Sequence, residues 1–129
     1  MSVLGIDPGT RKAGFAVVGR SGDVLALGVE PVGTFGDRIA LLVPEYAVEA
    51  IALGRGTNAA AIGTIVGSFG LPVHLVDETE TTLRARALYF EDHPPKGWRR
   101  LVPLGLLVPP RPIDDYAALL IARRYLGVG

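Results

Sequence analysis

The sequence predicts an α/β fold in which a mixed five-stranded sheet is flanked by helices on both faces. Two observations support this prediction. Three short apolar runs follow one another near the N-terminus with only turn residues between them, and connections this short join antiparallel strands. Further along, apolar runs of strand length alternate with helix-length segments, which implies right-handed crossovers between parallel strands. We expect residues 1–129 to form one domain, because this length supports a single core.

The antiparallel meander occupies the first part of the chain. Residues 2–6 form a near-continuous apolar run and are predicted to be a buried strand. Residues 13–18 form the second strand, and the turn formers at 20–23 lead into a third strand over 24–29.

The alternating part follows. Residues 36–47 are predicted to form a helix, 50–53 the fourth strand and 57–69 a second helix that Gly70 ends. The fifth strand is expected over 72–77, followed by a helix over about 79–90 and, after a long break, a last helix.

The break between these last helices, Asp92 to Pro112, holds six of the ten prolines. A structureless loop of about 20 residues is uncommon in so small a domain and is often functional. Its basic residues and one tryptophan suit phosphate contact and base stacking, although a solvated loop explains the same composition. The residues in question are Lys96, Trp98, Arg99 and Arg100.

Composition narrows the possible classes of protein. The net charge is zero, but residues 1–80 carry 9 acidic and 5 basic side chains and residues 81–129 carry 4 and 8. Such a split is compatible with a carboxylate site beside a basic surface for phosphate. The apolar runs are shorter than the ~20 residues of a membrane span, the start lacks a signal-peptide pattern, and no cysteine is present. We expect a cytoplasmic protein without membrane contact.

Carboxylates stand where three predicted elements end or begin. Asp7 closes the first strand, Glu78 follows the fifth, and Asp114 and Asp115 open the last helix. Crowded carboxylates are costly unless a cation lies between them, and Mg²⁺ or Mn²⁺ takes such hard oxygen ligands. The pattern therefore predicts a divalent-metal site at one edge of the sheet.

Each of these positions also has a plain structural interpretation. Asp7 could belong to an ordinary strand-end turn, Glu78 could favour the N-terminus of the next helix, and either later aspartate could be a helix N-cap. The Gly9-Thr10 turn could cradle a phosphate, as in sugar kinases of the actin-like superfamily, but those enzymes are much longer. The joint order of the three positions favours the metal site.

Three motifs carry a resemblance to a known family. Leu4–Gly14 resembles the first strand and turn of ribonuclease H-like nucleases, both RuvC-type Holliday junction resolvases and the YqgF/RuvX family of resolvases and pre-16S rRNA nucleases. Val76–Glu78 followed by Thr81 resembles the YqgF pattern, and Ile113–Ala118 resembles the last-helix motif of that family. A RuvC-type enzyme carries a glutamate at the end of the fourth strand, where this chain has Leu53–Gly56. The resemblance implies a ribonuclease H-like fold over nearly the whole chain.

The resemblance also implies roles. Asp7, Glu78 and Asp114 would be the catalytic residues and the ligands of Mg²⁺ or Mn²⁺, with Asp7 bridging two ions. Two such ions about 4 Å apart activate water and hold the leaving oxygen. Residue type and position, rather than the resemblance, predict the substrate contacts, which are Thr10, Arg11, Lys12, Lys96, Trp98, Arg99 and Arg100.

Asp114 is favoured over Asp115 as the third carboxylate, a choice that stays open by one residue. On a helix Asp114 shares a face with Ala117 and Ala118, the side expected to pack on the sheet, whereas Asp115 points nearer Ala122. Asp114 also aligns better with the family motif.

We therefore expect a metal-dependent nuclease that hydrolyses phosphodiester bonds in structured RNA, as in pre-rRNA processing, or in branched DNA. One alternative is a Holliday junction resolvase proper. Another is a catalytically weak, nucleic-acid-binding ribosome-biogenesis factor, suggested by Thr79 where the family usually has Arg. The expected partner is nucleic acid, and the sequence leaves monomer or homodimer open.

Overall fold

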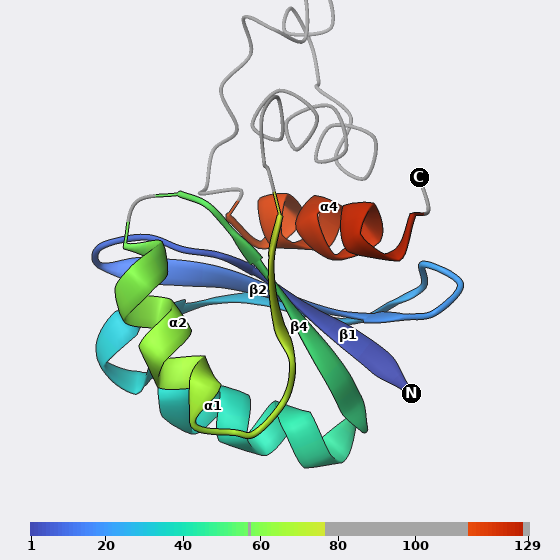
Figure 1. Cartoon of the computed structure of the whole chain (residues 1–129), viewed down its shortest axis with the longest axis horizontal. Coiled ribbons are helices and arrows are strands. Elements are labelled where there is room, and N and C mark those ends of the chain that lie inside the picture. The colour runs from blue at the N-terminus through green and yellow to red at the C-terminus, as the bar shows by residue number, and fades with distance from the viewer. Residues whose placement is uncertain (57, 77–113, 128–129) are drawn as a thin grey trace, which may run out of the picture.

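The sheet has the mixed topology that the sequence predicts. The computed structural model describes residues 1–56, 58–76 and 114–127, with only the backbone of Asp114. Its five-stranded sheet has the order β3-β2-β1-β4-β5 (Figure 1). The pairs β1–β2 and β2–β3 are antiparallel, whereas β1–β4 and β4–β5 are parallel. The strands are β1 (Ser2–Asp7), β2 (Lys12–Gly19), β3 (Val24–Pro31), β4 (Val48–Gly54) and β5 (Val73–Val76).

Helices cover both faces of this sheet, as predicted. Figure 1 shows α1 (Val32–Glu45) and α2 (Ala59–Gly67) on one face and α4 (Asp114–Leu126) on the other. The predicted helix over 36–47 begins earlier, directly after β3, because the Val32 amide donates to the carbonyl oxygen of Arg11 at 2.9 Å. The predicted helix over 79–90 and the loop over 92–112 lie outside the described residues.

The face under α1 and α2 holds the larger apolar core. Leu4 and Ile6 of β1 are fully buried there against Phe35 and Ile39 of α1 and Ile62 of α2. Burial of each such side chain contributes about 1.5–3 kcal/mol relative to exposure. This core fixes β1 in the middle of the sheet, where its last residue is Asp7.

The face under α4 is lined by small side chains. Ala16 and Ala52 of the sheet pack against Ala118 and Ala122 of the helix. Gly5 of β1 has no side chain at the point of closest approach, and a methyl group there would overlap the Ala118 carbonyl oxygen and stand 2.8 Å from the Ala122 methyl group. Small residues on both sides therefore let α4 pack close to β1.

The helix α4 runs opposite to β1. Tyr125 and Leu126 near its C-terminus share a pocket with Val3, near the start of β1, whereas Ala118 lies over Gly5. At the C-terminal end, Nε and Nη2 of Arg123 donate to the carbonyl oxygen of Gly22 in the β2–β3 turn, at 3.2 and 3.0 Å. The N-terminus of α4 consequently points towards the end of β1.

None of the helices in the described ranges has the length and hydrophobicity that crossing a bilayer requires.

Candidate active site

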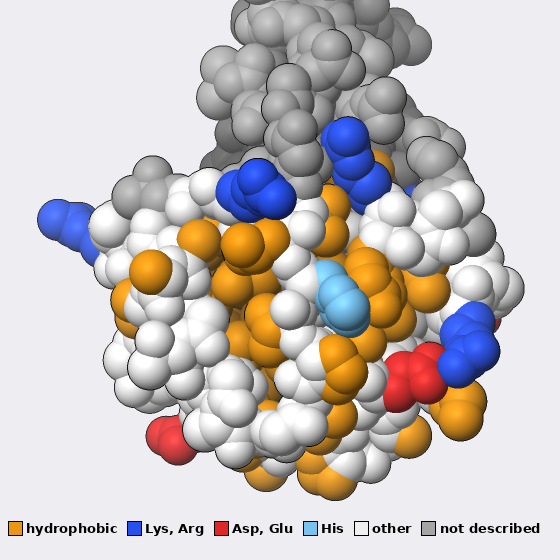
Figure 2. All heavy atoms as spheres, in the orientation of Figure 1, with side chains coloured by type: hydrophobic (Ala, Val, Ile, Leu, Met, Phe, Trp, Pro, Cys, Tyr) orange, Lys and Arg blue, Asp and Glu red, His pale blue; other side chains and the backbone are white. Residues whose placement is uncertain are grey.

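The predicted site residues that the structure describes lie at one edge of the sheet. Because β1, β4 and β5 are parallel, Asp7, Gly54 and Val76 end at the same edge. The β1–β2 connection brings Lys12 back to it, and α1 begins there at Val32. Figure 2 shows basic side chains on the upper rim of the face in view, the edge at which β4 and β5 end in Figure 1.

Strand alternation puts Asp7 on the α4 face of the sheet. Leu4 and Ile6 belong to the core under α1 and α2, whereas Val3 and Gly5 face α4. Asp7 lies two residues after Gly5, so its side chain is on the same face of the sheet. Asp7 belongs to the paired part of the strand, where it lies opposite Gly14 of β2. Its side chain is partly buried. The carboxylate therefore lies where the N-terminus of α4 arrives.

Asp7 and the start of α4 lie at about the same height along the direction of β1. Asp7 lies two residues beyond Gly5, roughly 6–7 Å along the strand. Asp114 and Asp115 precede Ala118 by four and three residues, roughly 4.5–6 Å along a helix of opposite direction. Since Gly5 and Ala118 are in contact range, the ends of the two elements bring these carboxylates to the same part of the edge.

Asp115 faces the sheet more than the sequence suggested. It is only 4% exposed, and its Oδ1 accepts a hydrogen bond from the backbone amide of Tyr116 at 2.9 Å. Ala122, the residue towards which Asp115 was expected to point, packs directly against Gly5. Both sides of the α4 N-terminus are thus compatible with a position near Asp7, and the helix-face criterion that favoured Asp114 does not separate the two aspartates.

The remaining predicted residues lie outside the described part. Glu78 and the cluster of Lys96, Trp98, Arg99 and Arg100 fall in the range 77–113, and only the backbone of Asp114 is described, as the first residue of α4. Among the side chains that the structure describes, no three Asp, Glu, His or Cys gather closely enough to hold a metal ion. The roles of Glu78, Asp114 and the basic cluster stay predictions from the sequence.

The turn that follows Asp7 is held from two sides. Nδ2 of Asn58, the residue before α2, donates to the carbonyl oxygen of Gly9 at 2.9 Å. At the other end of the turn, the carbonyl oxygen of Arg11 accepts the hydrogen bond from Val32. The side chains of Thr10, Arg11 and Lys12 are exposed at this edge, so they can reach a phosphate backbone.

Sequence reasoning missed Asn58. It expected the helix to begin at residue 57 and gave Asn58 no role. The available signal was the residue type, because Asn combines a short amide with tolerance of the left-handed conformation, and its φ is 69°.

Glu30 is a further carboxylate near this edge, but it belongs to a different face. It lies opposite Ala13, which faces the core under α1. Its carboxylate accepts hydrogen bonds from Thr34 at 2.5 Å and from Arg38 at 3.1 Å, and these lower the pKa of Glu30, that from Thr34 most. Glu30, near the end of β3, is therefore bound to the first turns of α1 and is no candidate metal ligand beside Asp7.

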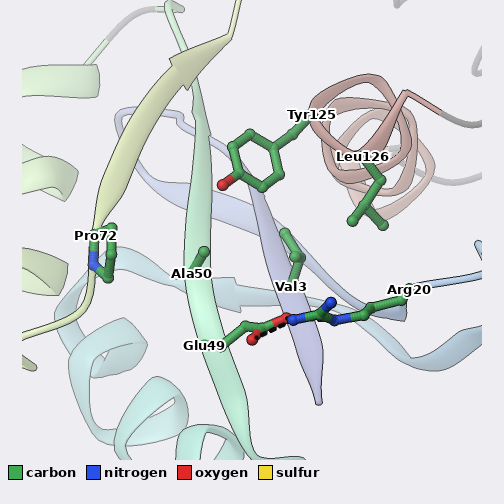
Figure 3. Close-up of a pocket in the computed structure, with 7 residues that line it drawn as sticks. All are labelled: Val3, Arg20, Glu49, Ala50, Pro72, Tyr125 and Leu126. Atoms are coloured by element: carbon green, nitrogen blue, oxygen red, sulfur yellow. Dashed lines mark hydrogen bonds and ion pairs between the residues drawn. The ribbon is translucent and has the colours of Figure 1, made fainter.

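A pocket of about 560 Å³ lies at the opposite end of the sheet. Figure 3 shows its apolar wall and the Arg20–Glu49 ion pair on its rim, with N–O distances down to 2.8 Å. Val3 and Ala50 stand near the starts of β1 and β4, far from Asp7. This pocket is therefore separate from the carboxylate edge, the edge of the sheet at which Asp7 and the start of α4 lie. Its apolar wall is formed by Val3, Ala50, Pro72, Tyr125 and Leu126.

Comparison with known proteins decides the family. No family model matches the chain. A protein of Pelotomaculum thermopropionicum named "putative pre-16S rRNA nuclease" is 32% identical, with 98% of this chain and 86% of that protein covered. The chain belongs to the YqgF/RuvX nuclease family. Two relatives of the same name, from Streptococcus pyogenes serotype M49 and Azotobacter vinelandii, are 32% and 29% identical, over 98% and 96% of this chain and 97% and 92% of their own length.

Solved structures agree on the fold of this YqgF/RuvX member. RuvC of T. thermophilus in complex with a Holliday junction substrate superposes with a TM-score of 0.61 at 24% identity, covering 95% of this chain and 90% of RuvC. The fowlpox virus resolvase, in complex with Holliday junction DNA, gives 0.62 at 11% identity, covering 98% and 97%. These likenesses confirm the ribonuclease H-like fold, and the relatives confirm the YqgF/RuvX family that the sequence motifs indicated.

Proposed function

We propose that this family member is a metal-dependent nuclease that hydrolyses phosphodiester bonds in structured RNA, with precursor 16S rRNA as the substrate class. The observation that supports it most is the placement of Asp7 on the α4 face of β1, at the level where Asp114 and Asp115 begin α4. A fold that packs a helix this closely through Gly5 and Ala118 brings the end of β1 and the start of α4, and with them these acidic residues, to the same part of the edge.

The donor set fits a hard divalent cation. Carboxylate oxygens are the ligands that Mg²⁺ and Mn²⁺ prefer, and Asp7, Glu78 and Asp114 are the proposed ligands. A pair of such ions would supply an activated water and neutralise charge on the leaving oxygen. In this proposal the sheet would hold Asp7 and α4 would hold Asp114, so that little reorganisation would be needed when the substrate phosphate arrives.

The proposed nucleic-acid contacts come from the turn after Asp7 and from a segment that lies outside the described residues. Thr10, Arg11 and Lys12 are exposed on the turn after Asp7, and cationic side chains at such positions contact phosphates without reading sequence. The segment with Lys96, Trp98, Arg99 and Arg100 is proposed to add phosphate contacts and base stacking. The proposed partner is thus RNA or branched DNA. The proposed compartment is the cytoplasm, and the site is compatible with a monomer or a homodimer.

The test compares cleavage of two substrates by three proteins. An RNA carrying the 16S rRNA flanks and a four-way DNA junction are each incubated with Mg²⁺ or Mn²⁺ and with the wild type, Asp7→Asn or Asp23→Asn. Asp23→Asn is the matched control, because it removes the same charge in the β2–β3 turn at the opposite end of the sheet. We expect metal-dependent RNA cleavage that Asp7→Asn abolishes and Asp23→Asn retains.

A junction resolvase is the second candidate, and the fold shared with RuvC and the fowlpox resolvase motivates it. Symmetric paired nicks in the four-way junction, with RNA left intact, would select the resolvase. If the protein is a catalytically weak binding factor, the wild type and Asp7→Asn should bind RNA equally well and cleave neither substrate. That result would reject the nuclease.

A further inference from the structure

We propose that Asn58 is a positioning residue of the active site, which holds the turn after Asp7 through the carbonyl group of Gly9. This inference rests on the proposed nuclease function for its kinetic consequence. The hydrogen bond from Asn58 Nδ2 to Gly9 O is 2.9 Å long, partly buried, and joins residues 49 apart in the chain. It is a side-chain contact between the loop after β4 and the turn that carries the predicted substrate cations.

The side chain of Asn58 does not cap the helix that it precedes. It is the N-cap of α2, yet its side chain makes no hydrogen bond to the first amides of that helix. A capping Asn normally stabilises a helix by about 1 kcal/mol relative to Ala. Its backbone also adopts the left-handed conformation, with φ 69° and ψ 15°. This conformation directs the amide group away from the helix and onto Gly9.

The turn itself is tight at the point that Asn58 contacts. A methyl group on Gly9 would overlap the carbonyl oxygen of Lys12, so the chain folds back on itself within three residues. The carbonyl group of Gly9 is partly buried and needs a hydrogen-bond partner there. The Asn58 amide supplies that partner.

Of the two anchors of this turn within the described residues, one depends on a side chain. The anchor at Arg11 is a backbone hydrogen bond from Val32, which substitutions leave in place. Asp7 is constrained separately, because it pairs with Gly14 in the β1–β2 ladder. Loss of the Asn58 amide therefore loosens mainly Gly9, Thr10 and the amide side of Arg11, because Asp7 stays paired with Gly14 and Lys12 with Pro31.

The consequence is a specific kinetic pattern. A loosened turn holds the Arg11 side chain less firmly against the substrate phosphates in the ground state and the transition state alike, which raises KM and leaves kcat nearly unchanged. We expect Asn58→Gly and Asn58→Asp to raise KM by about 3- to 10-fold, with kcat within about twofold of the wild type. Gly keeps the left-handed backbone without a side chain, and Asp keeps the shape without the N–H donor.

Ser2→Ala is the matched control. Ser2 Oγ donates to the carbonyl oxygen of Tyr46 at 2.8 Å, another partly buried side-chain-to-backbone hydrogen bond between segments distant in sequence. It lies at the start of β1, whereas Asp7 lies at its end. Ser2→Ala should lower the thermal midpoint about as much as the Asn58 variants and leave KM unchanged. A KM effect that followed stability alone would appear in all three variants and would overturn the proposal.

A second measurement tests whether Asn58 holds the turn, and it does not depend on nuclease activity. ¹⁵N relaxation should give backbone order parameters near 0.85 for Gly9, Thr10 and Arg11 in the wild type and Ser2→Ala, falling towards 0.6 in both Asn58 variants. Unchanged order parameters, or a mobile turn with an unchanged KM, would overturn the positioning role. If the wild type cleaves no substrate, the proposed function fails, and the order parameters still show whether Asn58 holds the turn.

Discussion

Gly5 of β1 and Ala118 of α4 are so close that no side chain fits between them. A methyl group on Gly5 would overlap the Ala118 carbonyl oxygen and approach the Ala122 amide nitrogen to 2.9 Å. The contact fixes the height of α4 above the sheet, and with it the distance between the end of β1 and the start of α4. The carboxylate edge therefore depends on a residue that has no functional group.

Gly5→Ala tests this dependence. The added methyl group must push α4 away from β1, because the nearest atoms belong to helix backbone and cannot rotate aside. We expect a loss of about 1–3 kcal/mol in the free energy of unfolding, measured by urea denaturation. Nuclease activity should fall further than the unfolded fraction explains, since the carboxylates separate in the folded state.

Gly67→Ala provides the control for the same chemical change. A side chain on Gly67, the last residue of α2, would meet nothing within 4 Å. Ala is preferred to Gly in a helix by up to about 1 kcal/mol, so this variant should be as stable as the wild type or slightly more stable. Equal stability losses in the two variants would contradict the close-packing explanation.

The choice between the two aspartates of α4 gives a second prediction. If Asp114 is the third ligand, Asp114→Asn should lower the cleavage rate by roughly 10²-fold or more, because ligand charge stabilises the transition state by several kcal/mol. Asp115→Asn should lower it by less than about tenfold, since Asn can still accept the amide hydrogen bond of Tyr116 that Asp115 accepts now. Rates are measured at saturating Mn²⁺ and compared with Asp7→Asn.

The reverse order of these two effects would assign the third carboxylate to Asp115. Its burial, at 4% exposure, makes a separate stability effect expected for Asp115→Asn. Thermal unfolding of both variants distinguishes a loss of fold from a loss of chemistry.

The strands of the meander and their antiparallel pairing could be predicted because their signals are local. The apolar run at β1 and the turn formers between β2 and β3 determine their pairing almost without alternatives. The start of α1 could not be predicted in the same way, because a long-range hydrogen bond from Val32 to Arg11 fixes it. A pattern of apolar residues carries no information about that bond.

The site was predictable as a set of positions and not as a set of contacts. Asp7 could be placed at a strand end from the sequence, and the structure has it there. The burial of Asp115 could not be predicted, because it depends on the contacts of Ala118 and Ala122 with Gly5, which set the face that α4 turns to the sheet. Asn58 escaped notice because its partner is 49 residues away and its own position gives only a capping signal.

The Arg20–Glu49 pair at the opposite end of the sheet predicts a dependence of stability on pH. Two hydrogen bonds of 2.9 Å from Arg20 lower the pKa of Glu49 below its ordinary value of 4.5. A carboxyl group whose pKa is lower in the folded state stabilises the fold above the ordinary pKa, and this contribution disappears as the pH falls through the lowered value. The pair is exposed, so its effect is small and screened by salt.

Urea midpoints of the wild type and Glu49→Gln between pH 3 and pH 7 measure this contribution. The wild type should be the more stable protein near pH 7, and the two curves should converge in acid. The difference at pH 7 should shrink in 1 M NaCl. A difference that persists at low pH and high salt would indicate packing around Glu49 rather than the ion pair.

The end of α4 yields the last prediction, which separates a hydrogen bond from a general charge effect. Arg123 and Arg124 both lie in the last helical turn, where a cation is favoured by the helix dipole. Only Arg123 donates to Gly22 O in the β2–β3 turn, through Nε and Nη2. Arg123→Ala should therefore lower the free energy of unfolding by about 1.5 kcal/mol, and Arg124→Ala by a few tenths at most. Cleavage should persist in both variants, because this contact lies at the end of α4 away from Asp7. Equal unfolding midpoints for the two alanine variants would mean that the dipole, and not the Gly22 contact, holds the C-terminal end of α4.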